Sequence, residues 1–138
     1  MRSATVQRET GETRIDLTLE LDGTGTLSGE TGIGFFDHML HALVKHARFD
    51  LSFTCAGDLH VDDHHSIEDL GICIGQAFHQ ALGDGRGITR FSHSYVPLDE
   101  ALCRTVVDIS GRGFLAFDSN YARPTIGAFS TEMVREFF

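Results

Sequence analysis

The sequence predicts an α+β fold built from a duplicated unit, on three observations. Segments whose apolar residues alternate are followed by two segments with helical apolar spacing. The motif Ile33-Gly34-Phe35-Phe36 is echoed by Ile126-Gly127-Ala128-Phe129. Gly23-Thr24-Gly25-Thr26-Leu27 is echoed in the same order by Gly111-Arg112-Gly113-Phe114-Leu115. A duplicated unit explains both echoes, although chance explains short matches equally well.

The first copy is predicted to contain several strands and two helices. Strands are predicted where apolar residues recur with a period of two, at residues 4–9, 13–22, 26–27 and 49–56. Gly11 and Glu12 lie at the turn between the first two strands. One helix is predicted from Phe35, and a second from His64 to a stop at Gly83.

The second copy is predicted to begin after a glycine-rich linker. We expect residues 1–87 to form the first half-domain and residues 88–138 the second. Strands are predicted at residues 88–96, 100–109 and 114–117, with Pro97 at a turn, and Ile126-Gly127 is expected to open a helix. The repeat offset places the counterpart of Gly83 beyond Phe138, so the second copy is expected to be incomplete.

Composition narrows the classes of function. The net charge of −9 argues against non-specific nucleic-acid binding. No apolar run approaches membrane-spanning length, and no segment resembles a signal peptide. The three cysteines, Cys55, Cys73 and Cys103, stand in apolar runs and are expected to be buried thiols. A cytoplasmic protein with neither membrane nor nucleic-acid partners is therefore expected.

The segment Asp62-Asp63-His64-His65-Ser66-Ile67-Glu68-Asp69 is the strongest candidate for a site. On a helix, His64 and Glu68 lie about 40° apart on one face, whereas His65 projects about 100° from His64. Imidazole and carboxylate groups suit Mn, Fe or Zn, and the two histidines point to two ions. A plain helix N-terminus, capped by Asp63 or Ser66, explains the same residues.

Further histidines and two arginines extend this hypothesis. His38, His41 and His46 lie within nine residues on the first predicted helix, so they favour a site over scattered surface histidines. Arg90 and Arg112 are each explained as surface charges, but as a pair they would suit a phosphate. Taken by itself, Glu12 is an ordinary turn residue.

These residues resemble the imidazoleglycerol-phosphate dehydratase family of histidine biosynthesis. The resemblance covers the whole chain and is carried by Arg8-Glu9-Thr10-Gly11-Glu12-Thr13, Gly34-Phe35-Phe36-Asp37-His38-Met39-Leu40-His41, the Asp62–Asp69 segment, Arg90-Phe91 and Ser110-Gly111-Arg112-Gly113. It implies two half-domains, each a mixed sheet with two helices, and helices packed between the sheets. It also implies two Mn²⁺ ions per site and homo-oligomers, with trimers forming a 24-subunit shell and sites built between subunits.

The resemblance also implies residue roles. His38, His64, His65 and Glu68 would bind metal and, through it, substrate, which is a phosphorylated imidazole compound. Glu12 and His46 would contact the substrate, and Arg90 and Arg112 would hold its phosphate. Glu12 is the candidate for moving the proton during dehydration, and Glu68 is the second catalytic candidate.

One departure from the family pattern leaves an alternative open. The family's second His-His-x-x-Glu motif does not occur in this sequence, and Glu136 aligns with a further metal-binding histidine. A metal-binding oligomerisation module without turnover is therefore the alternative to a dehydratase.

Overall fold

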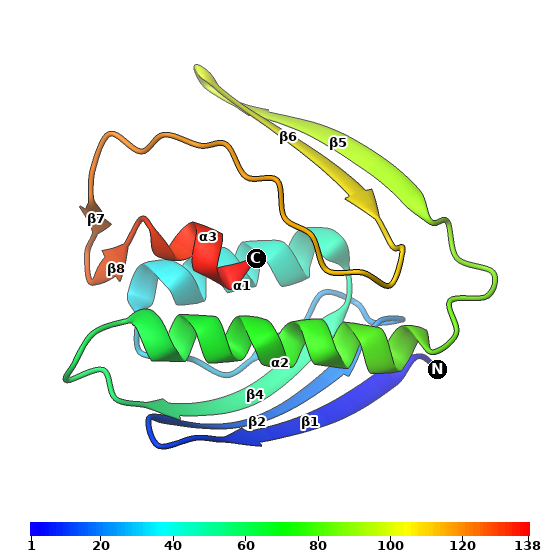
Figure 1. Cartoon of the computed structure of the whole chain (residues 1–138), viewed down its shortest axis with the longest axis horizontal. Coiled ribbons are helices and arrows are strands. Elements are labelled where there is room, and N and C mark those ends of the chain that lie inside the picture. Colours follow the sequence, from blue (N-terminus) through cyan, green and yellow to red (C-terminus); the bar gives the residue numbers. More distant parts are fainter. The chain divides into compact units, whose positions relative to one another are not determined.

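A computed structural model describes all residues from Met1 to Phe138. Contacts divide the chain into two compact units (Figure 1). The first comprises Met1–Gly83 and Phe117–Phe138, and the second comprises Asp84–Ala116. These two units are defined by packing. The half-domains 1–87 and 88–138 were instead predicted from repetition in the sequence, which packing does not test. They therefore stay a prediction.

The first unit contains a four-stranded mixed sheet with the strand order β1-β2-β4-β3. Strands β1 (Ser3–Glu9), β2 (Thr13–Glu20) and β4 (Asp50–Gly57) are antiparallel, and β3 (Leu27–Ser28) runs parallel to β4. Every second residue of β2 is buried, which confirms the alternation predicted from the sequence. The buried face of the sheet is apolar and includes Val6, Ile15, Leu17, Leu19, Leu51 and Phe53.

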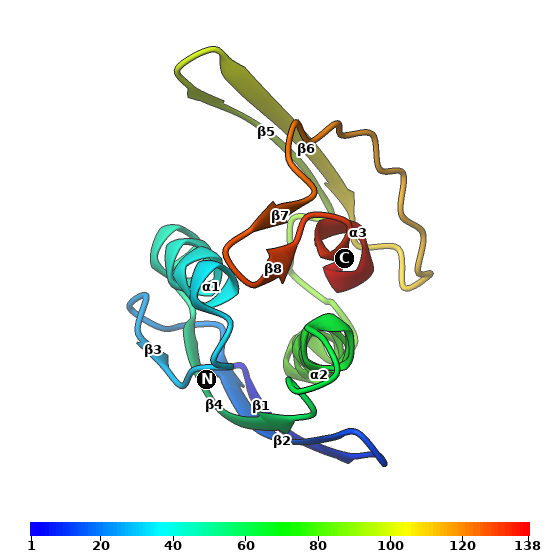
Figure 2. The same ribbon diagram turned by 90° about the vertical axis from the view of Figure 1, so that its left-hand side faces the viewer.

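Two helices cover this apolar face, as Figures 1 and 2 show. They are α1 (Gly34–Ala47) and α2 (His64–Leu82), close to the predicted bounds. Their buried side chains recur at helical spacing: Phe36, Leu40 and Val44 on α1, and Ile67, Leu70, Cys73, Ile74 and Ala77 on α2. Gly83 ends α2 with a positive φ of 58°, which confirms its predicted role as the helix stop.

Helix α2 approaches the end of β4 very closely at Gly57. A Cβ atom at this position would lie only 2.0 Å from the Oγ atom of Ser66. The buried Ser66 hydroxyl has no hydrogen-bond partner, so it does not cap the helix. Asp62 accepts a hydrogen bond from the His64 backbone N–H at 2.9 Å instead.

The end of the chain adds a short hairpin and a helix to the first unit. Strands β7 (Thr125–Ile126) and β8 (Phe129–Ser130) flank a tight turn, and α3 (Met133–Phe137) follows. The prediction that Ile126-Gly127 opens a helix was therefore wrong. Gly127 has a φ of 59°, which suits a hairpin turn and is incompatible with the start of a right-handed helix.

The hairpin is tied to the start of α2. The side chain of Asp63, the residue before α2, accepts hydrogen bonds from the backbone N–H of Ser130 at 2.6 Å and from its hydroxyl at 3.0 Å. Asp63 therefore does not cap its own helix. The ring of Phe129 also stacks on that of Phe36, with centroids 6.2 Å apart. These contacts place residues 129–130 against both helices.

The second unit is built around an antiparallel hairpin of β5 (Phe91–Leu98) and β6 (Ala101–Asp108). Pro97 lies inside β5 opposite Leu102, so its predicted place at a turn was wrong. A two-stranded ribbon consists of edge strands, and an edge tolerates a residue without an N–H donor. The turn falls at Asp99, where φ is 48°.

Two further predictions for the second half were also wrong. Residues 114–117 form no strand, because no neighbouring segment pairs with them. Of the three cysteines expected to be buried, Cys73 is buried, Cys55 is half-buried and Cys103 is exposed. All three are free thiols. The mainly antiparallel mixed sheet, with helices on one of its faces, nevertheless confirms the α+β fold class. None of the helices is both long and apolar enough to cross a membrane.

The contact between Gly57 and Ser66 gives a first testable prediction. Gly57→Ala should lower the free energy of unfolding by about 1–3 kcal/mol, because the added methyl overlaps the Ser66 side chain. Ser66→Ala should be close to neutral by itself, since its buried hydroxyl has no hydrogen-bond partner. Combining both changes should recover part of the loss in denaturant unfolding, and strictly additive effects would contradict the proposed overlap.

Candidate active site

Three segments meet at one end of the four-stranded sheet. Thr13, at the start of β2, pairs with Gly57 at the end of β4, and α2 packs on both strands. The β1–β2 turn, the residues after β4 and the first turn of α2 are therefore neighbours. Figures 1 and 2 show that α1 also begins at this end of the sheet.

His64 and Glu68 form the pair that their helical spacing predicts. The Nε2 atom of His64 lies 3.5 Å from a carboxylate oxygen of Glu68, one turn further along α2. Both side chains are only partly buried, so solvent and small molecules reach them. The imidazole of His64 and the carboxylate of Glu68 are therefore close enough to contact the same ligand.

His65 has a different partner, Asp58, which the sequence analysis missed. The Nδ1 atom of His65 lies 3.0 Å from one Asp58 oxygen and 3.2 Å from the other. An ionised carboxylate accepts hydrogen bonds only, so Nδ1 carries the proton and the neutral ring keeps the Nε2 lone pair free. The hydrogen bond to Asp58 raises the pKa of His65, and the negative charges of Asp58, Glu12 and Asp62 act in the same direction.

Glu12 is brought to the same region by the β1–β2 turn. It directly precedes Thr13, which pairs with Gly57, so Glu12 lies at the end of the sheet where Asp58 binds His65. Its negative charge also helps to raise the pKa of His65, after the larger effects of Asp58. The turn is held by Thr10, whose hydroxyl accepts the backbone N–H groups of Glu12 at 3.1 Å and Thr13 at 3.0 Å. The Glu12 side chain is exposed and free to meet a ligand.

The remaining histidine candidates lie on α1. His38 is in the first half of this helix and His46 in its last turn, about 12 Å further along the axis. Both are exposed. In this single chain no three His, Cys, Asp or Glu side chains gather into a group that could hold a metal ion. The donor types of His64, His65 and Glu68 suit a divalent transition metal, but by themselves they would provide only part of a coordination sphere.

The two arginine candidates lie in the second unit, and both act on Asp108. The Arg90 guanidinium donates to Asp108 at 2.7 Å and stacks over the Phe91 ring. The charge of Arg112 adds to that of Arg90 in lowering the pKa of Asp108, for which the hydrogen bond from Arg90 is the main cause. Asp108 therefore occupies the position where the positive potential of the two arginines overlaps.

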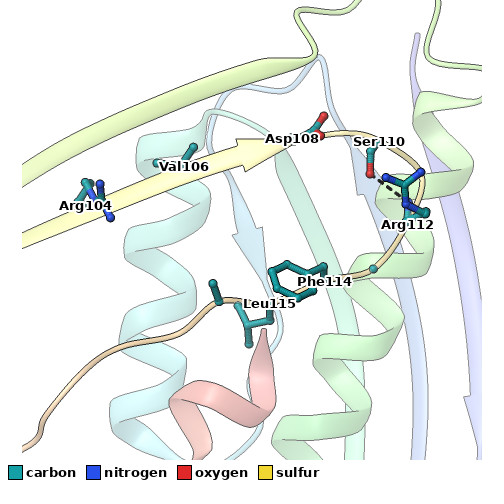
Figure 3. A pocket seen from close by; sticks show the side chains of 9 residues that line it. Arg104, Val106, Asp108, Ser110, Arg112, Phe114 and Leu115 are labelled. Atoms are coloured by element: carbon teal, nitrogen blue, oxygen red, sulfur yellow. Dashed lines mark hydrogen bonds between the residues drawn. The ribbon is translucent and has the colours of Figure 1, made fainter.

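A cavity of about 670 Å³ opens beside Asp108 and Arg112 (Figure 3). Its lining residues alternate along β6 and continue into the next loop: Arg104, Val106, Asp108, Ser110, Arg112, Gly113, Phe114, Leu115 and Ala116. Figure 3 shows Arg104 and Arg112 at opposite ends of this row, with the Ser110 hydroxyl accepting the Arg112 backbone N–H at 3.3 Å. Arg104 was not identified from the sequence, because its alternation with apolar residues is that of any exposed strand position.

Comparison with protein families gives a match over most of the chain. Residues 31–138 match the family model described as imidazoleglycerol-phosphate dehydratase. The proteins named imidazoleglycerol-phosphate dehydratase from Xanthobacter autotrophicus and Acidiphilium cryptum are 59% and 56% identical to this chain. The alignments cover 100% and 99% of the chain, and 70% of each relative.

Two solved structures agree with the sequence comparison. The imidazoleglycerol-phosphate dehydratase of Staphylococcus aureus has a TM-score of 0.85 and 36% identity, over 98% of this chain and 74% of that one. The Pyrococcus furiosus protein, crystallised in complex with (S)-C348, has a TM-score of 0.79 and 31% identity, over 96% of this chain and 69% of that one. Sequence and fold together show that the chain belongs to the imidazoleglycerol-phosphate dehydratase family of hydro-lyases, which acts in histidine biosynthesis.

Proposed function

We propose that this protein converts imidazole glycerol phosphate to imidazole acetol phosphate in L-histidine biosynthesis, and that the reaction depends on Mn²⁺. Family membership supports the dehydration. The observation that carries the proposal for the site is that Glu12, His65 and the His64–Glu68 pair lie at the same end of the sheet. These groups come from separate segments and include an accessible carboxylate and accessible imidazoles.

Glu12 is proposed to move the proton. Dehydration removes a hydroxyl group from one substrate carbon and a proton from the neighbouring carbon, which together leave as water. An exposed carboxylate on an ordered turn can accept the carbon-bound proton and return a proton to the departing hydroxyl. Glu68 is the second carboxylate at this end of the sheet and the second catalytic candidate.

His38, His64, His65 and Glu68 are proposed to hold the metal. Bound Mn²⁺ would supply Lewis-acid stabilisation of negative charge on the substrate imidazole. Asp58 supports this role for His65, because a carboxylate on Nδ1 fixes the ring and directs Nε2 outward. Since one chain gathers only part of a donor set, we propose a homo-oligomer in which another copy supplies the remaining donors, and in which His46 contacts substrate.

Arg90 and Arg112 are proposed to bind the substrate phosphate. Charge-assisted hydrogen bonds from two guanidinium groups suit a phosphate dianion. A phosphate would compete with Asp108 for Arg90, and Arg112 has no ion-pair partner that would need to be displaced. We place the enzyme in the cytoplasm, since its three cysteines are free and the family is biosynthetic.

Turnover tests the proposed reaction. The protein supplied with Mn²⁺ should consume imidazole glycerol phosphate, and Glu12→Gln should lower kcat by about 10²–10⁴-fold with little change in KM, because it removes the proton acceptor. Glu9→Gln, an exposed neighbour at the end of β1, serves as the control and should behave like the parent. No turnover by the parent, or equal rates for both variants, would contradict the proposal.

Metal content tests the proposed ligands independently of turnover. His65→Ala should lower the manganese retained per chain after dialysis, because it removes an imidazole donor. His79→Ala, in the last turn of α2, should leave manganese unchanged. Unchanged stoichiometry in His65→Ala would show that His65 is not a ligand.

Ligand affinity tests the proposed phosphate site. Arg112→Gln should weaken binding of imidazole glycerol phosphate by about 1.5–3 kcal/mol for each charged hydrogen bond lost. Arg86→Gln is the matched control, since Arg86 is exposed and paired with Asp84. Calorimetry with the phosphorylated and dephosphorylated compounds separates the phosphate contribution, and the idea fails if the parent binds both equally.

A further inference from the structure

The carboxylate of Asp69 joins the β1–β2 hairpin to α2 at a point next to Glu12. One oxygen, Oδ1, accepts a hydrogen bond from Nε of Arg8 on β1 at 2.8 Å, and it lies 2.8 Å from the Nη2 atom of the same side chain. The other oxygen, Oδ2, accepts the hydroxyl of Thr13 on β2. A single carboxylate therefore binds both strands of the hairpin, with one contact before and one after the turn that carries Glu12.

This contact is buried, although the turn beside it is exposed. Asp69 is 5% exposed and Thr13 is 4% exposed. Burying a carboxylate is costly unless it is paired and hydrogen-bonded, and both Asp69 oxygens are satisfied. The contact therefore has one strongly preferred arrangement. A free two-strand turn, in contrast, has only its own short-range hydrogen bonds to hold it.

The position of Asp69 on α2 relates the turn to the histidine pair. Asp69 follows Glu68 directly and lies one helical turn after His65, among the buried residues of α2. Thr13 carries the link onward, because its hydroxyl also lies 3.2 Å from that of Thr10, which binds the Glu12 N–H. An unbroken chain of contacts thus runs from α2 to the Glu12 backbone.

We propose that Asp69, with Arg8 and Thr13, is a positioning device that holds the Glu12 turn against the N-terminal end of α2. None of the three contacts the substrate in this proposal, and they act by fixing where the Glu12 carboxylate lies. The catalytic consequence rests on the proton-transfer role given to Glu12 above. The proposal that these contacts order the Glu12 turn does not depend on that role.

Thr13→Val tests this device, because valine keeps the shape of threonine and removes only the hydroxyl. We expect kcat to fall about 10- to 100-fold with little change in KM, the result of a small displacement of a catalytic group. Thr13→Ser should restore the parent kcat. Thr18→Val is the matched control, since the Thr18 hydroxyl makes a similar contact with Thr5, 3.1 Å away, on the exposed face of the same hairpin.

The Glu12→Gln background separates positioning from a general loss of folding. If Thr13 acts through Glu12, Thr13→Val should cause no further fall in kcat once Glu12 has been replaced. An equal fall in both backgrounds would overturn the catalytic part of the proposal. Arg8→Lys, which keeps the charge but loses the two-donor geometry, provides a second variant that should show the same dependence on Glu12.

Amide hydrogen exchange gives a measurement that does not require turnover. In Thr13→Val the backbone amides of residues 10–13 should exchange about tenfold faster, because a hydrogen bond of typical net strength is lost. Exchange in the middle of α2 should not change. If the parent shows no turnover, the proposed function is wrong, but hydrogen exchange still tests whether Asp69, Arg8 and Thr13 hold the Glu12 turn in place. Unchanged exchange at residues 10–13 would show that they do not.

Discussion

The close approach of α2 to the end of β4 requires that the chain has no side chain at Gly57. The backbone of β4 reaches the Ser66 side chain at this point, and the apolar face of α2 packs on the sheet beyond it. The start of the helix is therefore fixed at the end of β4. His65 meets Asp58 there, one residue after Gly57, and Glu12 is nearby because β2 pairs with β4. The candidate site depends on this one close approach between backbone and helix.

Local patterns predicted the structure of residues 1–87 well and that of residues 88–138 poorly. The bounds of α2 followed from periodic burial and from Gly83, both of which are properties of adjacent residues. Pro97 failed as a turn marker, because whether a proline interrupts a strand depends on whether its edge has a neighbour. Ile126-Gly127 has the same local sequence as Ile33-Gly34 but forms a turn. The two motifs fold differently because different segments surround them, and a four-residue motif carries no information about those segments.

The candidate site was predictable where its residues are close in sequence. The His64–Glu68 pair followed from helical geometry, and the structure places the two side chains together. Asp58 was missed because its contact with His65 depends on the path of an irregular loop, and no spacing rule describes such a path. Asp69 was noted only as part of a motif, since its partners lie 56 and 61 residues away. Arg90 and Arg112 were identified, but Asp108, the acid on which both act, was not.

The hydrogen bonds from Ser130 to Asp63 give the hairpin near the end of the chain an influence on the histidines. Asp63 immediately precedes His64, and its carboxylate satisfies a distant backbone group in place of its own helix. A change at either position leaves buried polar groups of the other without a partner. Across relatives, the two positions should therefore co-vary although 67 residues separate them.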